Sequence, residues 1–477
     1  MHSPLTKPGM LTSYVDELWE NEIIGVLSDY VTIRCLSPEF DPAWARDGEI
    51  GRAARLLSQW AASRPIPGSV VEIVAREGLT PVIIADVPAT PGAETELVTL
   101  LYGHFDKQPP LGSWREGLDP FVAVREGDRL YGRGTADDGY SIFAAVGALE
   151  ALAATGTPHG RCVVLIESSE ESGSPHLGLY LDEVADRIGE PGPGLVVCLD
   201  SGCATYDRLW STNTLRGSLI VTLRVEVLSE GIHSGSAGGV VPSSFRLMRQ
   251  LLSRIEDEAT GEILVPELHA EPPGRYLAAN EAIISELGPA ATGDFPTVPS
   301  LELSGLNASD RLLRRTWMPA LEVTGIDGVP SVKDGGNVLR SFTTAKLSLR
   351  LPPPVDPDRA GKALLRALSA DPPQGAKVSA VVVSAAPGFC APPQAEWLAR
   401  ATGEASESFF GRQAGAMSEG GTIPFLAELV SRFPDAQFLV TGVLGPSSNA
   451  HGPNEMLDLA TARRLTAAVA YVLASAP

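Results

Sequence analysis

Five short segments of the sequence combine carboxylate, imidazole and turn-forming residues in a pattern that could bind metal ions. They are GHFD at 103–106, GRGTADDG at 132–139, ESSEESGS at 167–174, CLDSG at 198–202 and AHGPNE at 450–455. The chain has only seven histidines, and two of them, His104 and His451, lie in these segments. Imidazole and carboxylate ligands suit zinc, cobalt or manganese better than calcium. The combination predicts a metal centre that activates water for hydrolysis.

Five side chains could hold two divalent ions around one bridging carboxylate. In this arrangement Asp137 bridges the ions, His104 and Asp200 complete the ligands of one, and Glu171 and His451 complete those of the other. Three carboxylates and a bridging hydroxide would balance four positive charges, and a neutral cluster can remain buried. We therefore expect two divalent ions per subunit, of Zn, Mn or Co.

Two further carboxylates have expected roles beside the ligands. Asp106 follows His104 by two positions and could accept its second ring N–H, which would fix the tautomer of the imidazole. Glu170 precedes the ligand Glu171 and is the expected general base, taking a proton from the metal-bridged water and passing it to the leaving amine. Both residues are therefore candidates for catalysis of amide hydrolysis.

Two other sites are excluded by the same segments. Gly132 and Gly134 resemble the start of a dinucleotide-binding loop, but Asp137 stands where its third glycine would be. No Gly-x-Ser-x-Gly sequence occurs, which argues against an α/β-hydrolase nucleophile. Each metal-binding segment is weak evidence alone, and their occurrence together carries the prediction.

Continuous apolar runs typical of strands buried on both faces must position these residues. These runs are Val82–Ile84, Leu97–Tyr102, Val163–Ile166, Leu195–Leu199 and Phe438–Val443. Helical periodicity occurs between and around them, at Tyr14–Val31, Ile50–Ala62, Ser141–Ala154 and Ala460–Ala474. The polar residues follow the strand ends, where open α/β sheets carry their sites. The pattern predicts a mostly parallel mixed sheet flanked by helices.

A second domain is predicted within the first. Ser218–Val227 and Lys346–Leu351 alternate apolar and polar residues, as antiparallel strands with one solvated face do. We therefore expect a catalytic domain in two parts, residues 1–212 and 388–477, and an inserted α+β domain at 213–387.

Composition narrows the class of protein further. The 477 residues contain 37 Lys and Arg against 58 Asp and Glu, and this net charge of −21 argues against nucleic-acid binding. No apolar stretch is long enough to predict a membrane span. The five cysteines form no Cys-x-x-Cys pair, which favours a reduced, cytoplasmic protein.

The segments together resemble the aminoacylase, carnosinase and carboxypeptidase G superfamily of two-metal amidohydrolases. Within it, VTIRCLSPEFDP at 31–42 and SEGGTIP at 418–424 are most similar to the branch of cytosolic non-specific dipeptidase and carnosinase. The resemblance implies a di-zinc exopeptidase-like fold with a ferredoxin-like lid that forms a homodimer. It implies the ligand roles above and a cis peptide after Asp137. The family commonly has Asp-Asp-Lys-Gly where this chain has Gly139 and Tyr140 after the Asp pair.

The resemblance also implies a set of residues that bind substrate. His233 in GIHSGSAGG would reach the partner's active site and stabilise the oxyanion. Arg350 would bind the substrate carboxylate, with Asn337 as an accompanying contact. Gly421 and Thr422 would line the substrate pocket.

The expected function is hydrolysis of dipeptides or related small peptides by a metallodipeptidase. An N-acyl-amino-acid deacylase or desuccinylase with the same metal chemistry is the alternative enzyme. A catalytically inactive metal-binding or assembly protein is the alternative from another class, although the presence of every expected ligand and of Glu170 disfavours it.

Overall fold

The computed structural model describes residues 7–93, 95–293, 295 and 297–477, and the chain divides into two compact units. Unit 1 contains the described residues up to Asn213 together with 391–417 and 428–477, and unit 2 contains 214–390 and 418–427. Two of the hydrogen bonds that join the short segment 418–427 to the rest of unit 2 involve Arg216. Nε of Arg216 donates to the carbonyl of Gly420 at 3.2 Å, and Thr422 Oγ1 donates to the carbonyl of Arg216 at 2.6 Å.

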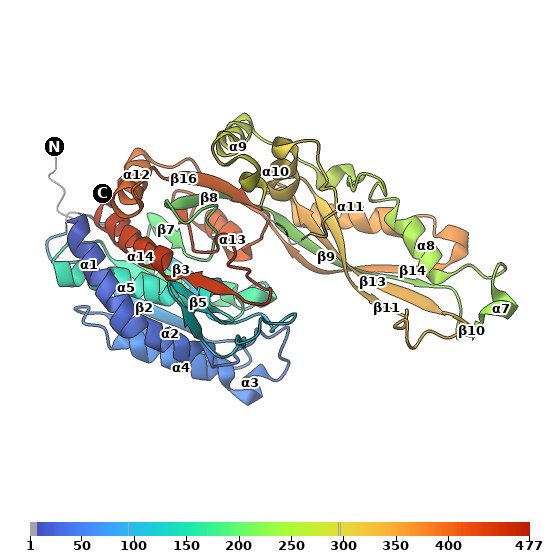
Figure 1. Cartoon of the computed structure of the whole chain (residues 1–477), viewed down its shortest axis with the longest axis horizontal. Helices are drawn as coiled ribbons and strands as arrows, with labels where there is room; N and C mark the ends of the chain where they lie inside the picture. Colours follow the sequence, from blue (N-terminus) through green and yellow to red (C-terminus); the bar gives the residue numbers. More distant parts are fainter. Residues whose placement is uncertain (1–6, 94, 294, 296) are drawn as a thin grey trace. The chain divides into compact units, whose positions relative to one another are not determined.

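Unit 1 contains a six-stranded mixed sheet in the order β1-β2-β6-β3-β7-β17, of which β2, β3 and β7 are labelled in Figure 1. The strands are β1 (Val70–Val74), β2 (Val82–Val87), β3 (Thr99–His104), β6 (Cys162–Glu167), β7 (Leu195–Cys198) and β17 (Gln437–Val440). The pairs β6/β3, β3/β7 and β7/β17 are parallel, and β1 and β2 join in antiparallel register. Every residue of β3, β6 and β7 is buried, as the continuous apolar runs predict. The predicted mostly parallel mixed sheet is confirmed.

Helices flank this sheet. They are α1 (Pro8–Leu18), α2 (Ile24–Val31), α3 (Trp44–Asp47), α4 (Glu49–Ala62), α5 (Ser141–Thr155), α6 (Leu181–Ile188), α12 (Glu396–Phe410) and α14 (Leu459–Ala474). A π-helical turn, Trp19–Ile23, continues α1 into α2. The helix predicted at 14–31 is therefore part of one continuous helical stretch that begins at Pro8. Helix α14 packs against both α5 and α12, and α1 packs against α5 and α14.

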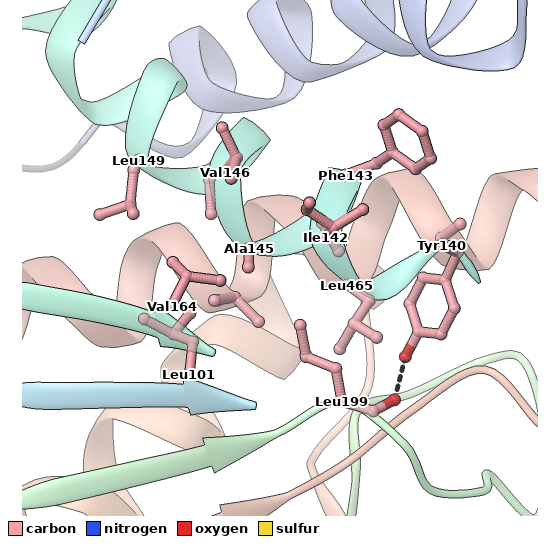
Figure 2. Packing of buried hydrophobic residues seen from close by; sticks show 14 of the residues in the cluster. Leu101, Tyr140, Ile142, Phe143, Ala145, Val146, Leu149, Val164, Leu199 and Leu465 are labelled. Carbon is pink, nitrogen blue, oxygen red and sulfur yellow. Dashed lines mark hydrogen bonds between the residues drawn. The ribbon is translucent and has the colours of Figure 1, made fainter. Parts of the chain in front are cut away.

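Helix α5 lies in the centre of the apolar core (Figure 2). Its residues from Ser141 to Leu152 are all buried, because other helices and the sheet surround it. Ile142 and Val146 belong to the same core cluster as Leu101 of β3. Just before the helix, the Tyr140 hydroxyl donates a hydrogen bond to the carbonyl of Leu199, immediately after β7. The residues that precede α5 are therefore tied to the end of the sheet.

Unit 2 contains a four-stranded antiparallel sheet in the order β11-β13-β9-β14. Its strands are β9 (Gly217–Glu226), β11 (Ala320–Asp327), β13 (Phe342–Leu351) and β14 (Lys377–Ala386). Buried and partly exposed residues alternate along β9, and α8 (Ser244–Leu252) and α11 (Pro357–Ser369) pack against the sheet (Figure 1). This confirms the predicted α+β unit with one helix-covered face.

The remaining elements are short or lie at the edges of the units. In unit 2 they are β10 (Ile232–His233), α7 (Ser234–Ala237), α9 (Gly274–Leu287), α10 (Ala308–Thr316) and β12 (Val338–Leu339). The others are β4 (Val124–Glu126), β5 (Arg129–Tyr131), β8 (Trp210–Leu215), β15 (Phe389–Cys390), β16 (Gly415–Glu419), α13 (Pro424–Arg432) and β18 (Met456–Asp458). Within the described residues, no helix has both the length and the apolar character that a bilayer crossing requires.

Candidate metal centre

Three adjacent parallel strands bring four of the predicted site residues to one end of the sheet. His104 is the last residue of β3, and Asp200 follows β7 by two positions. Glu170 and Glu171 lie in a single helical turn, Glu170–Ser172, just after β6. Because β6, β3 and β7 are neighbours and run parallel, these side chains meet at the carboxyl end of the sheet.

Asp137 reaches the same place from the turn that precedes α5. The peptide bond between Asp137 and Asp138 is cis, which confirms the cis peptide that the family resemblance implies. Asp138 is buried, and its Oδ2 accepts a hydrogen bond of 3.0 Å from the backbone N–H of His104. The turn that carries Asp137 is therefore bonded directly to the strand that carries His104.

The two carboxylate oxygens of Asp137 face different imidazoles. Oδ1 lies 3.3 Å from Nε2 of His104, and Oδ2 lies 3.0 Å from Nε2 of His451. The same nitrogen of His104 is 3.7 Å from Asp200 Oδ1. The same nitrogen of His451 is 3.2 Å from Glu171 Oε2. The five predicted ligands thus form two halves that share Asp137.

The buried imidazole of His104 fits a metal ligand. Neither of its ring nitrogens makes a hydrogen bond of good geometry to any described residue, although both are buried. Ligand atoms of His104, Asp137 and Glu171 all lie within 4.8 Å of one another. Ligand atoms of His104, Glu170 and Asp200 form a second group of the same size. An orphaned imidazole among carboxylates is the donor set that Zn, Mn or Co prefers.

The electrostatics of the cluster show an excess of buried negative charge. Burial and the neighbouring carboxylates raise the pKa of Asp200 to about 6. Burial would lower the pKa of His104, but the carboxylates around it, Asp200 first, raise this pKa well above its usual value. The pKa of His451 is raised to about 11 by Asp137 and Glu171 against the effect of burial. Such a cluster needs compensating cations, which divalent ions would supply.

Asp106 supports both sides of the cluster. Its Oδ1 lies 3.4 Å from Nδ1 of His104. Its two oxygens accept hydrogen bonds of 3.1 Å from the backbone N–H groups of Glu170 and Glu171. Glu171 is further oriented by Gln108, whose Nε2 donates to its Oε2 at 2.7 Å. The spacing of His104 and Asp106 predicted the first contact, whereas the bonds to Glu170 and Glu171 appear only in the folded chain.

The other predicted site residues lie in unit 2 and form two pairs. His233 is exposed in β10, and its Nδ1 accepts a hydrogen bond of 3.1 Å from Gly235 N–H, so Nε2 carries the proton in the neutral ring. Asn337 lies beside it, since its carbonyl accepts from Ser234 N–H at 2.9 Å. Arg350, on β13, donates from Nη1 to Thr422 Oγ1 at 2.8 Å.

The glycines of the 418–424 segment differ in their surroundings. A side chain on Gly420 would lie 2.5 Å from the carbonyl oxygen of Arg315 and 2.9 Å from Nη2 of Arg216. A side chain on Gly421 would meet none of the described atoms within 4 Å. Gly420 is therefore required by the fold of unit 2, while open space surrounds the predicted substrate contact Gly421.

The structure also explains the glycine at the position of the family's usual lysine. A side chain on Gly139 would come within 2.3 Å of Tyr30 Cε1 and 2.4 Å of the Gly134 carbonyl oxygen. The Tyr30 ring occupies this space, and its hydroxyl donates to the Phe105 carbonyl at 2.7 Å. Gly139 therefore matches the packing around the Asp137 turn.

Two buried arginines, Arg133 and Arg216, and one buried glutamate, Glu455, had no role predicted from the sequence. Arg216 holds the 418–427 segment, and Arg133 and Glu455 form an ion pair of 2.7 Å beside Asp137. Arg133 lies in the segment GRGTADDG and Glu455 in AHGPNE. A charged residue inside a glycine-containing motif was therefore the signal in the sequence that could have pointed to them.

Comparisons with known proteins agree with this geometry. The sequence profile of Peptidase family M20/M25/M40 matches residues 100–475. The chain is 25% identical over 366 residues to the Cysteinylglycine-S-conjugate dipeptidase of Corynebacterium striatum, a match that covers 75% of this chain and 76% of that protein. It is 24% identical over 482 residues to the human Beta-Ala-His dipeptidase, covering 96% and 90% of the two chains.

Solved structures share the fold over nearly the whole chain. The di-peptidase Dug1p of Saccharomyces cerevisiae superposes with a TM-score of 0.81 at 22% identity, covering 99% of each chain. Human carnosine dipeptidase 1 superposes with a TM-score of 0.79 at 21% identity, covering 98% of this chain and 99% of that one.

Proposed function

Because the chain belongs to Peptidase family M20/M25/M40, we propose that it is a metallodipeptidase that hydrolyses the amide bond of dipeptides and related small peptides. The observation that carries this proposal is the position of Asp137 between His104 and His451. Relatives named as dipeptidases, among them those of Corynebacterium striatum and human, support the substrate class.

In this proposal five side chains hold two divalent ions. Asp137 would contribute to holding both ions, with His104 and Asp200 holding one of them and Glu171 and His451 holding the other. Bound ions would polarise the scissile carbonyl and lower the pKa of a water molecule toward about 7. Zinc, manganese and cobalt all suit the donor set.

Glu170 is the proposed general base. Its carboxylate lies at the cluster, with a ligand atom within 4.8 Å of those of His104 and Asp200. Asp106 holds the backbone of Glu170 in place. Glu170 would take a proton from the attacking water as a general base and then deliver it to the leaving amine as a general acid.

Arg350 is the proposed anchor for the free carboxylate of the substrate. No carboxylate of the described residues lies within salt-bridge distance of this half-buried guanidinium, and Thr422 occupies only Nη1. Burial lowers its pKa, so a bound anion would relieve an uncompensated charge. A guanidinium binds a carboxylate through two hydrogen bonds.

We further propose a cytoplasmic homodimer in which unit 2 is the lid and dimerisation domain. The exposed Nε2–H of His233 is free to reach a neighbouring subunit, and Asn337 lies beside it. The edge strand β11 exposes Val323 and Ile326, an apolar edge that a second copy could cover. All five cysteines are free thiols, as a reducing compartment requires.

A substrate panel tests the proposed function. Purified protein loaded with each of the three metals would be assayed on dipeptides, on the same dipeptides with an amidated C-terminus, and on N-acetyl and N-succinyl amino acids. The proposal expects the highest kcat/KM on free dipeptides. A preference for N-acyl amino acids would replace it with the deacylase, and no hydrolysis with any metal would contradict both.

A further inference from the structure

Glu455 is a buried carboxylate that joins the turn carrying Asp137 to the loop carrying His451. It is 0% exposed. Its Oε1 accepts hydrogen bonds from the backbone N–H groups of Ala136 at 3.0 Å and Asp137 at 3.1 Å. The N–H of Gly134 lies 3.0 Å from both of its oxygens. One carboxylate therefore accepts from three backbone N–H groups of the Asp137 turn, where a carboxylate is limited to about four acceptor sites.

Arg133 fastens the other side of this junction. Its Nη1 forms an ion pair of 2.7 Å with Glu455 Oε2, and the pair is almost completely buried. Its Nη2 donates at 2.8 Å to the carbonyl of Gly452, the residue after His451. The planar guanidinium thus contacts the carboxylate and the His451 loop at once, which a lysine ammonium on a flexible stem could not reproduce.

The His451 loop needs such a fastening because its own conformation is unfavourable. His451 has φ +62°, and Ser447, Asn449 and Asn454 also have positive φ angles of +70°, +51° and +61°. Residues other than glycine persist in this left-handed region only where the surrounding structure holds them. The side chain of His451 is 54% exposed and contacts Asp137 and Glu171 through Nε2. The backbone on which it stands must therefore hold the ring where these contacts can form.

We propose that Glu455, held by Arg133, is a positioning residue that keeps His451 facing Asp137 and so maintains the half of the metal centre formed by Asp137, Glu171 and His451. The inference rests on the proposed metal centre and deepens it. Glu455 is not itself a proposed ligand, because its oxygens are used by Arg133 and the backbone N–H groups. The His104 and Asp200 half is held separately by the sheet and by Asp106.

Metal binding by Glu455→Gln tests the inference. The amide keeps the shape of the side chain but loses the charge and turns one acceptor into a donor facing Arg133 or Gly134. We expect affinity for the ion on the His451 side to fall about 10- to 100-fold, as is usual when the partner that orients a ligand is lost, while the ion on the His104 side stays bound. Isothermal titration with Mn²⁺ and elemental analysis of the folded, dialysed protein measure both sites.

Two further variants separate positioning from loss of stability. Glu150→Gln removes another buried carboxylate of the same unit, one in the last turns of α5 that accepts from Tyr14 at 2.8 Å, and should keep both ions. Arg133→Lys keeps the buried positive charge, but the lysine cannot contact Glu455 and Gly452 together. This variant should therefore lower the affinity for the ion on the His451 side, and it provides the test even if Glu455→Gln does not fold.

The outcomes are distinct. Wild-type affinity for both ions in a folded Glu455→Gln or Arg133→Lys protein would overturn the positioning role and leave the proposed function intact. Equal loss of the ion in Glu150→Gln would also overturn it, because general destabilisation would then be the cause. A wild-type chain that bound fewer than two ions would contradict the proposed metal centre itself.

Discussion

The backbone N–H of Glu170 donates a hydrogen bond of 3.1 Å to Oδ1 of Asp106, the oxygen that also lies 3.4 Å from Nδ1 of His104. One carboxylate therefore contacts the ring of a proposed ligand and accepts from the backbone of the proposed base. Since Asp106 follows β3 and Glu170 follows β6, this contact depends on the parallel pairing of the two strands.

Replacing the proposed base should stop catalysis without removing metal. We expect Glu170→Gln to lower kcat by about 10²- to 10⁴-fold, because the amide cannot accept the proton of the attacking water. Elemental analysis should show wild-type metal content. Glu77→Gln, on an exposed carboxylate of the same unit, is the matched control. Near-normal turnover by Glu170→Gln would rule out the assigned role.

Ligand replacement should reveal which residue bridges the ions. We expect Asp137→Asn to lose both ions on dialysis, whereas Asp200→Asn should keep the ion on the His451 side, because only Asp137 faces both imidazoles. Elemental analysis gives the metal content, and thermal unfolding with and without a chelator gives the stabilisation by bound metal, about 2.7 kcal/mol when the free ion is at 100 times its Kd. Equal metal content in the two variants would argue against a bridging Asp137.

Loss of the substrate anchor should appear in KM and only for free carboxylates. We expect Arg350→Met to raise KM for dipeptides about 10- to 100-fold, the effect of losing a charged hydrogen bond. Thr422→Val should have a smaller effect in the same direction, since Thr422 orients Arg350. Dipeptide amides should respond to neither change, and Arg366→Met, an exposed arginine on α11, is the control. An equal rise in KM for the amides would refute carboxylate binding by Arg350.

A cross-subunit role of His233 can be tested by mixing two inactive variants. His233→Ala should lower kcat about 10²- to 10³-fold, as loss of an oxyanion donor does, with the dimer mass unchanged by light scattering. Random exchange with Glu170→Gln subunits should restore about a quarter of wild-type activity, because each hybrid of a two-fold dimer contains one intact site. A stable hybrid without recovered activity would exclude the exchange of His233 between subunits.

Lys107 should make stability depend on pH in the alkaline range. Its buried ammonium donates to the carbonyls of Tyr30, Val31 and Ile33, and burial lowers its pKa to about 8. In the unfolded chain a lysine has a pKa of about 10.4. Between these values the unfolded state holds a proton that the folded state has lost, so the free energy of unfolding rises with pH by about 3 kcal/mol.

The comparison of wild type with Lys107→Met isolates this effect. The difference in their free energies of unfolding, measured by denaturant titration in chelator, should shift in favour of the wild type between about pH 8 and pH 10.4. Ionisation of cysteines and tyrosines distant from Lys107 cancels in the difference, and the neighbouring Cys35 is replaced by serine in both proteins because its thiol interacts with the Lys107 charge. A difference that stays constant over this range would show that Lys107 keeps its charge in the folded chain up to the pKa of an unfolded lysine, which would contradict the lowered pKa.

Much of the fold follows from local patterns in the chain. The apolar runs at 82–84 and 163–166 became β2 and β6, and alternation at 218–227 became β9, because burial on one or both faces leaves a direct record in the residue types. The same reasoning placed His104, Glu171 and Asp200 near one another, since parallel strands end at a common edge.

Contacts between distant segments required the folded chain. Nothing in the local pattern of Glu455 reveals that its carboxylate would be buried on the N–H groups of the Asp137 turn, or that Arg216 would draw residues 418–427 into unit 2. The sequence alone determined which side chains could bind metal and which strands would carry most of them. The tertiary structure decided how His451 meets Asp137 and what holds it there, because a buried charge must find partners that only long-range packing provides.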